Sequence, residues 1–151
     1  MLNDFIVYTD GSCLGNPGAG GFSAVIINCE TGEVSEISGG ESHTTNNRME
    51  LRAAISALDI IPTGTSVEII TDSQYLKNAF TKGWISNWKR NGWRTAAKTP
   101  VLNQDLWLIL DDFMRSHQIL FSWVKGHDGD KYNERCDQLA REQATYFKFH
   151  S

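Results

Sequence analysis

Two apolar segments of this chain end in the same way, and no other sequence feature restricts the fold as strongly. Phe5–Thr9 leads into Asp10, and Val67–Thr71 leads into Asp72, so each segment finishes in a Thr-Asp pair. We expect both segments to be strands. If they are parallel neighbours about 4.8 Å apart, the two carboxylates converge at the carboxyl ends of the strands, where open α/β sheets bind their ligands.

Two further acidic residues are predicted to lie on helix faces made of small residues. Glu50 shares its face with Ala53, Ala54 and Ala57, and Asp137 shares its face with Asn133, Ala140 and Ala144. Each acid alone has a structural explanation: Asp10 and Asp72 could cap the segments that follow them, Glu50 could pair with Arg48 or Arg52, and Asp137 could pair with Arg141. The four together predict one shared site, because like charges held close together need cations between them.

A site built from carboxylates favours hard cations. Oxygen ligands select Mg²⁺ or Mn²⁺ over Zn²⁺. Two such ions about 3.5–4 Å apart can promote in-line displacement at phosphorus, because one lowers the pKa of the attacking water while the other stabilises the leaving oxygen. A covalent nucleophile is then unnecessary, and neither Ser12 nor Ser73 has an evident base beside it in the sequence.

The length and composition fit one compact domain over residues 1–151. The chain has 151 residues, of which 40% are hydrophobic, so it can bury a sizeable core. It contains no apolar run long enough to span a bilayer and no basic, apolar leader, so we expect no membrane association and a cytoplasmic location. Its three cysteines include no Cys-x-x-Cys pair, which predicts reduced thiols rather than disulfides or a zinc site.

The net charge of -4 conceals a basic, tryptophan-rich segment. Residues 73–104 contain no Asp or Glu, but they hold six basic residues together with Trp84, Trp88 and Trp93. Cations that displace counterions and indoles that stack on sugars or bases suit a nucleic-acid strand. The alternative is a solvated helical face whose tryptophans belong to the core.

The order of elements along the chain predicts an α/β fold with a mixed sheet. Strands are expected at residues 5–9, 22–28, 34–38, 67–71 and 119–124, with a Gly-rich turn over residues 11–21. Helices are expected from Thr45 or Asn46 to the residue before Pro62, and over residues 73–80, 102–115 and 130–144. The first three strands form an antiparallel meander, and the helical crossover makes the fourth strand parallel to its neighbour. The aromatic tail after Ala144 could pack on the domain or fray.

Motifs run in order across nearly the whole chain. They are Tyr8-Thr-Asp-Gly-Ser-Cys-Leu-Gly-Asn-Pro-Gly18, Thr44-Thr-Asn-Asn-Arg-Met-Glu-Leu51, Thr71-Asp-Ser-Gln-Tyr75, Trp123-Val-Lys-Gly-His127 and Asn133-Glu-Arg-Cys-Asp-Gln-Leu-Ala140. This set resembles type 1 ribonuclease H, bacterial form. The resemblance implies a five-stranded mixed sheet flanked by helices, in which strands 1–3 are antiparallel and strands 1, 4 and 5 are parallel.

The resemblance also implies a reaction: hydrolysis of phosphodiester bonds in the RNA strand of an RNA/DNA hybrid, with two Mg²⁺ ions, leaving 5'-phosphate and 3'-hydroxyl ends. Mn²⁺ is an alternative ion, and the enzyme is expected to be a monomer. By this likeness Asp10, Glu50, Asp72 and Asp137 are the catalytic, metal-binding carboxylates. His127 matches a histidine that moves protons or helps release product. Without the motif, His127 would be an ordinary surface histidine.

Contacts to the hybrid follow from the same resemblance. Cys13, Asn16, Asn46 and Gln74 are expected to read the minor groove through side chains or the adjacent backbone, and Thr45 with Asn16 to hold a phosphate of the DNA strand. Asn16 also suits a turn and Thr45 a helix cap, and both uses can coexist.

The tryptophan-rich segment resembles a basic protrusion that grips the hybrid outside the active site. The matching residues are Trp84, Trp88, Lys89, Arg90 and Trp93. Uncharged residues stand at Asn91, Ala97, Thr99 and Leu102, which predicts weaker affinity for the hybrid, and Asp128 adds an acid near the expected metals.

Other classes of function remain as alternatives. A phosphatase or a metal-dependent DNA nuclease of the transposase-like group could use a similar acidic cluster on the same fold. The polar minor-groove set and the basic segment argue against both. A non-catalytic hybrid-binding module is the third alternative, but it would lack at least one of the four acids, and all four are present.

Overall fold

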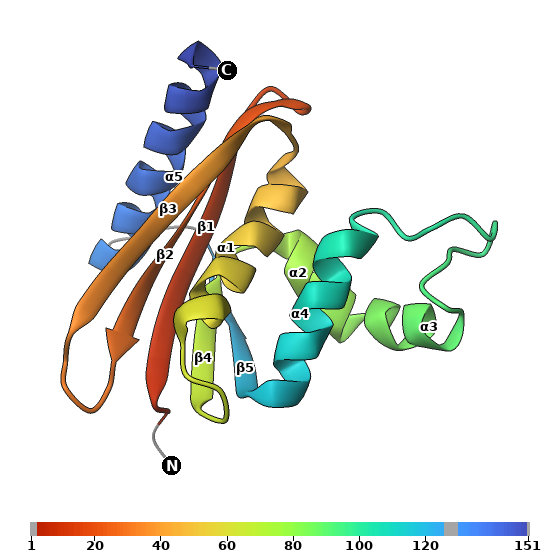
Figure 1. The fold of residues 1–151 in the computed structure, drawn as a ribbon, viewed down its shortest axis with the longest axis horizontal. Helices are drawn as coiled ribbons and strands as arrows, with labels where there is room; N and C mark the ends of the chain where they lie inside the picture. Colours follow the sequence, from red (N-terminus) through yellow and green to blue (C-terminus); the bar gives the residue numbers. More distant parts are fainter. Residues whose placement is uncertain (1–2, 126–129, 151) are drawn as a thin grey trace.

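The computed structural model describes residues 3–125 and 130–150, and within these ranges five strands form one mixed sheet. The strands are β1 (Phe5–Leu14), β2 (Gly18–Asn28), β3 (Val34–Thr44), β4 (Ser66–Thr71) and β5 (Gln118–Trp123), in the spatial order β3-β2-β1-β4-β5 (Figure 1). Strands β1, β2 and β3 pair antiparallel, whereas β4 is parallel to both β1 and β5. The mixed sheet expected from the sequence is confirmed.

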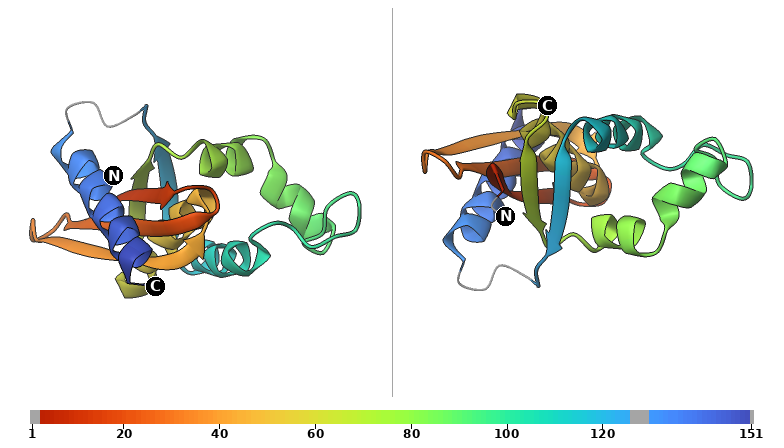
Figure 2. Two further views of the ribbon diagram at one scale, coloured as in Figure 1. Left: turned by 90° about the horizontal axis from the view of Figure 1, so that it is seen from above. Right: turned by 90° about the horizontal axis from the view of Figure 1, so that it is seen from below.

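Helices cover both faces of the sheet. They are α1 (Asn46–Ile60), α2 (Gln74–Thr81), α3 (Trp84–Arg90), α4 (Gln104–Ser116) and α5 (Lys131–Phe149). Helix α5 lies across β1, β2 and β3 on one face, and α1 packs on the other face with α4 beside it (Figure 2). Helices α2 and α3 follow β4 and lead away from the sheet. Of the helices in the described ranges, none combines the length and the apolar character that a membrane crossing requires.

The main core lies between the sheet and the α1 side of the molecule. Along β4 the burial alternates, so Val67, Ile69 and Thr71 face this core while the residues between them face the other side. Leu51 of α1 and Trp107 of α4 are 0% and 1% exposed and close the core from the helical layer. This packing fixes the position of the carboxyl end of β4, which Asp72 directly follows.

The sequence predicts a turn over the whole Gly-rich segment, residues 11–21, but most of this segment belongs to strands. Strand β1 continues to Leu14 and β2 begins at Gly18, so only residues 15–17 connect them. A Cβ on Gly20 would lie 3.0 Å from Met49 Cγ of α1, and a Cβ on Gly21 would lie 2.1 Å from the Ala140 carbonyl oxygen of α5. Because successive residues of a strand face opposite sides, the two glycines admit one helix to each face of β2.

Two helices differ from the sequence prediction. The basic, tryptophan-rich segment contains a short helix of its own, α3, and α5 continues five residues beyond the expected end, to Phe149. The aromatic tail is therefore helical rather than frayed. A Cβ on Gly40 would lie 2.8 Å from Phe147 Cδ2, so the tail packs closely against β3.

Candidate active site

Two of the predicted acids come from neighbouring strands of the sheet. The parallel pairing of β1 and β4 ends at Tyr8 and Ile70, and Asp10 and Asp72 each lie two residues further along. The sequence predicts that the first strand ends at Asp10, but β1 continues past this residue and goes on pairing with β2, where Asp10 faces Ser23. The site therefore opens where β4 stops beside a strand that continues.

Glu50 reaches the same place because α1 passes directly against β1 at Gly11. A Cβ on Gly11 would lie 2.7 Å from the backbone nitrogen of Glu50, so any other residue would push the helix away. The Gly11 backbone N–H donates hydrogen bonds to Glu50 Oε1 at 3.1 Å and to Asp10 Oδ1 at 2.9 Å. Gly11 thus holds two carboxylates from different elements beside one another.

The three carboxylates form a compact group. Asp10, Glu50 and Asp72 each offer an oxygen that lies within 4.8 Å of the others, and Asp10 and Glu50 are both only 4% exposed. Burial, followed by the charges of Asp10 and Asp72, raises the pKa of Glu50 well above its usual value. Glu50 Oε2 has no hydrogen-bond partner among the described residues. A buried carboxylate oxygen without a donor, beside two further acids, fits a divalent cation.

Asp137 approaches from the opposite side of the sheet. It lies on α5 and lines the same pocket as the other three acids, a cavity of about 410 Å³. Its side chain is 32% exposed, and Arg141 Nε donates to its Oδ2 at 2.8 Å. The ion pair that offered a structural explanation for Asp137 therefore exists, although it does not remove the residue from the pocket.

Some of the predicted minor-groove residues surround this pocket. Asn46, at the start of α1, and Gln74, at the start of α2, both line it. Asn16 Oδ1 accepts a hydrogen bond from the Asn46 backbone N–H at 3.2 Å, and the Thr45 hydroxyl caps α1 by accepting from Arg48. These contacts tie the β1–β2 connection to the beginning of α1.

Cys13 is placed differently from the other predicted contacts. Its thiol donates toward the carbonyl oxygens of Thr44 and Gly18, at 3.5 and 3.6 Å. It is not among the residues that line the acidic pocket. Burial raises the pKa of the Cys13 thiol. In this structure the thiol joins β1 to the ends of β2 and β3.

The predicted protrusion contacts lie on α3 and the loop after it, which extend to the side of the molecule (Figure 1), and none of them lines the acidic pocket. Trp84, Trp88 and Trp93 are half-buried against the main core, and the ring centroids of Trp88 and Trp107 are 5.4 Å apart. Lys89 Nζ forms an ion pair with Asp111 Oδ1 at 2.8 Å, and Arg90 donates to Asn87. The indoles therefore belong partly to the core, while Arg90 remains exposed.

His127 and Asp128 lie outside the described residues, which leave out 126–129. Their predicted roles stay predictions. The last described residue before this gap is Lys125, which follows β5, and the first after it is Asp130, which caps α5.

Besides Gly11, three residues that line the pocket were given no role at the site in the sequence analysis: Asn47, Ser73 and Tyr75. Ser73 caps α2, because its hydroxyl accepts from the Leu76 backbone N–H at 3.2 Å. The Tyr75 hydroxyl accepts hydrogen bonds from Trp107 Nε1 at 2.9 Å and from Asn103 Nδ2 at 3.1 Å, which links the pocket to α4. The available signal was their position, within three residues of Asp72 or directly after Asn46.

Comparisons with known proteins agree with this geometry. A family model described as RNase H matches residues 3–145. The Ribonuclease H of Rhodopseudomonas palustris strain BisB5 is 53% identical over 150 residues, which cover 99% of this chain and 98% of the relative. LC9-RNase H1, a type 1 RNase H with the type 2 active-site motif, has a TM-score of 0.81 at 31% identity, over 94% of this chain and 72% of that one. LC11-RNase H1, solved in complex with an RNA/DNA hybrid, shares the fold at 24% identity, with a TM-score of 0.67 over 94% of this chain and 97% of that one.

Proposed function

Since the chain belongs to the RNase H family and is a ribonuclease H enzyme, we propose the substrate and the mechanism that its site supports. The substrate is an RNA/DNA hybrid, in which the enzyme cuts the RNA strand internally and leaves 5'-phosphate and 3'-hydroxyl ends. The whole chain acts as one catalytic domain and as a monomer. The observation that carries the proposal is the convergence of Asp10, Glu50 and Asp72 in one pocket.

The four acids Asp10, Glu50, Asp72 and Asp137 would hold two divalent ions, with Mg²⁺ as the natural choice and Mn²⁺ as a substitute. Carboxylate oxygens without His or Cys ligands suit these hard cations. When bound, the ions supply an activated water and charge stabilisation at the leaving oxygen. The orphaned Glu50 Oε2 is the observation that most directly supports such a role.

The protein itself contributes position. Gly11 orients Glu50 and Asp10 through its backbone N–H, so these two carboxylates are held beside one another before a cation binds. Asp137 is held by Arg141, whose side chain is 63% exposed, and an exposed ion pair is weak enough to be exchanged for a cation. His127 would move protons at the site, as expected from its motif.

Recognition of the hybrid would use the rim of the pocket. Asn46 and Gln74 lie there with amide groups that can both donate to and accept from a ribose 2'-hydroxyl. Thr45 stands at the start of α1, where free backbone amides favour a phosphate of the DNA strand. The α3 segment would add nonspecific contacts through Arg90 and Lys89. The hybrid bound by LC11-RNase H1 supports this choice of substrate.

Cleavage of end-labelled substrates tests the proposal. The chain is expected to cut an RNA/DNA hybrid with Mg²⁺ present and to leave matched duplex DNA and duplex RNA intact, with no cutting after addition of a chelator. Mapping the ends of the products with phosphatase and ligase checks the 5'-phosphate and 3'-hydroxyl. Cutting of duplex DNA would favour the transposase-like alternative, and hybrid binding without cutting would favour the non-catalytic module.

A further inference from the structure

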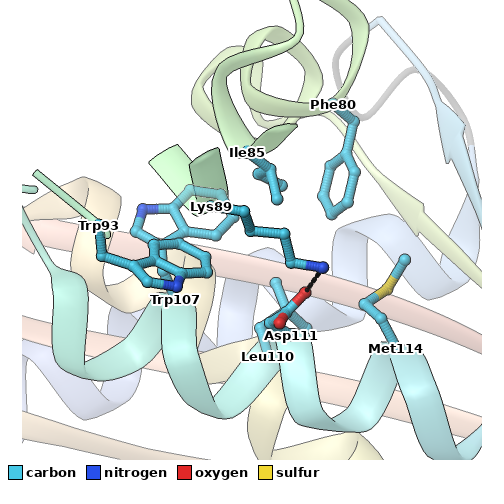
Figure 3. Close-up of a pocket in the computed structure, with 8 residues that line it drawn as sticks. All are labelled: Phe80, Ile85, Lys89, Trp93, Trp107, Leu110, Asp111 and Met114. Atoms are coloured by element: carbon cyan, nitrogen blue, oxygen red, sulfur yellow. Dashed lines mark ion pairs between the residues drawn. The ribbon is translucent and has the colours of Figure 1, made fainter. Parts of the chain in front are cut away.

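A second pocket lies between α4 and the segment formed by α2 and α3. Its volume is about 170 Å³. Phe80 and Ile85 approach from α2 and α3, Leu110 and Met114 lie on α4, and Lys89 reaches across from α3 to Asp111 of α4 (Figure 3). None of its lining residues lines the acidic pocket, so the two sites are separate.

Six of the eight residues that line this pocket are apolar, and three of these six are aromatic. Trp107 and Leu110 form a rigid floor at 1% exposure each, and the rings of Trp93 and Phe80 stand at the sides. Met114 adds a flexible thioether, which adapts to the edge of a ring. A dry, wholly apolar cavity of about 150 Å³ accommodates benzene in another protein. The size and lining therefore fit a single aromatic ring.

The polar groups at the opening indicate the charge of the ligand. Asp111 is 11% exposed and already receives two cations, Lys89 at 2.8 Å and Arg115 at 2.6 Å. Lys89 is 45% exposed, and its ammonium has three N–H donors with one acidic partner among the described residues. The Lys89 ammonium therefore keeps N–H donors beyond its bond to Asp111, and charged donors of this kind suit an anionic group.

We propose that this pocket binds a small aromatic carboxylate, with its ring between Trp107 and Ile85 and its carboxylate on Lys89 Nζ. Lys89 would then contact the ligand and Asp111 at once. The ligand would also contact both α3 and α4, so it would stabilise the packing of the α3 segment against α4. This proposal concerns a site outside the acidic pocket and does not depend on the reaction proposed there.

Benzoate and its neutral counterpart benzamide, added separately to the native chain, test the proposal. We expect saturable shifts of the Trp93 and Trp107 indole N–H signals in ¹H–¹⁵N spectra, with the Trp123 signal unchanged. For a ligand this small the dissociation constant should be about 1 mM. Benzoate should bind about tenfold more tightly than benzamide, because a charge-assisted hydrogen bond to Lys89 is lost in the neutral compound.

The variant Lys89→Gln should remove the advantage of benzoate over benzamide, whereas Arg90→Gln, one residue further on and outside the pocket, should keep it. Equal affinity of the two probes for the native chain would overturn the assignment of an anionic ligand. No saturable shift at about 10 mM, or shifts spread over the whole surface, would overturn the site itself. These readouts involve no cleavage, so their failure would leave the proposed reaction untouched.

Discussion

Ser23 of β2 donates a 2.6 Å hydrogen bond to the backbone carbonyl of Cys136, the residue that precedes Asp137 on α5. Ser23 is also the residue that faces Asp10 across the β1–β2 ladder. One fully buried hydroxyl therefore connects the strand position opposite the first acid to the helix that carries the fourth. The distance between these two acids depends on how firmly α5 is seated on β2.

The variant Ser23→Ala tests this connection. Loss of the hydrogen bond should lower the free energy of unfolding by about 1 kcal/mol. Cleavage should slow by about three- to tenfold, since small displacements of positioned groups reduce turnover. Ser38→Ala is the matched control, because Ser38 pairs with Ser23 on β3 but is exposed. Chemical denaturation and steady-state kinetics measure both effects, and a Ser23→Ala enzyme with native turnover would argue against a positioning role.

Replacement of the most buried strand acid should separate catalysis from binding. Asp10→Asn keeps the shape of the side chain but replaces one acceptor oxygen by an N–H donor group and removes a negative charge from the site. Turnover should fall by at least about 10²-fold, while hybrid affinity should stay within a few fold. Asp59→Asn, an exposed change on α1, serves as control. Robust cleavage by the Asp10→Asn enzyme would show that the metal site has been misplaced.

Glu50 makes the stability of the metal-free protein depend on pH. Its pKa is raised in the folded state by burial and by Asp10 and Asp72, so the folded chain holds this proton more tightly than the unfolded chain. Glu50 therefore stabilises the folded state at pH values below the ordinary pKa of a glutamate. This contribution is lost as the pH rises through the pKa that Glu50 has in the folded state. In chelator at neutral pH, Glu50→Gln should raise the free energy of unfolding by roughly 1–3 kcal/mol.

Divalent ions should make the native chain more stable than Glu50→Gln, the reverse of the order expected in chelator. Mg²⁺ should stabilise the native chain by mass action and should stabilise Glu50→Gln much less. Thermal melts of both proteins, with chelator and with Mg²⁺ over a pH series, provide the measurement. A Glu50→Gln protein that is less stable than the native chain in chelator at neutral pH would contradict the raised pKa.

The two basic residues of α3 should differ in their contribution to hybrid binding. Arg90 is exposed, so Arg90→Ala should reduce the slope of log affinity against log salt by about 1. Lys89 begins in an ion pair with Asp111, so Lys89→Ala should change the slope less. The double variant should show the flattest dependence. Fluorescence anisotropy at several salt concentrations measures the slopes, with Lys148→Ala on α5 as the control. If the slopes of the α3 variants equal that of the native chain, the hybrid does not contact α3.

The sequence predicts the sheet well because its signals are local. The repeated Thr-Asp ending identifies the two parallel strands, and the register of Tyr8 with Ile70 confirms that the acids after them are level. The start of α1 at Asn46 follows from Thr45, whose hydroxyl forms the expected cap. In each case a short stretch of neighbouring residues carries the signal.

The Gly-rich segment and Cys13 could not be predicted in the same way, because their roles depend on partners far along the chain. Turn propensity explains Gly15, but Gly11 and Gly21 are required by helices that begin more than 30 residues later. The Cys13 thiol is occupied by the carbonyl of Thr44, which only tertiary packing brings near. Close approach between distant elements leaves no periodic pattern in the sequence.

Trp88 lies at the centre of an indole cluster, with ring centroids 6.0 Å from Trp84, 6.2 Å from Trp93 and 5.4 Å from Trp107. The excited states of rings this close couple to one another. We therefore expect the four indoles between α3 and α4 to dominate the near-ultraviolet circular dichroism spectrum of the protein. A movement of the protrusion would change the coupling between these chromophores. The chain thus carries an intrinsic optical reporter at the junction of α3 and α4, beside the second pocket.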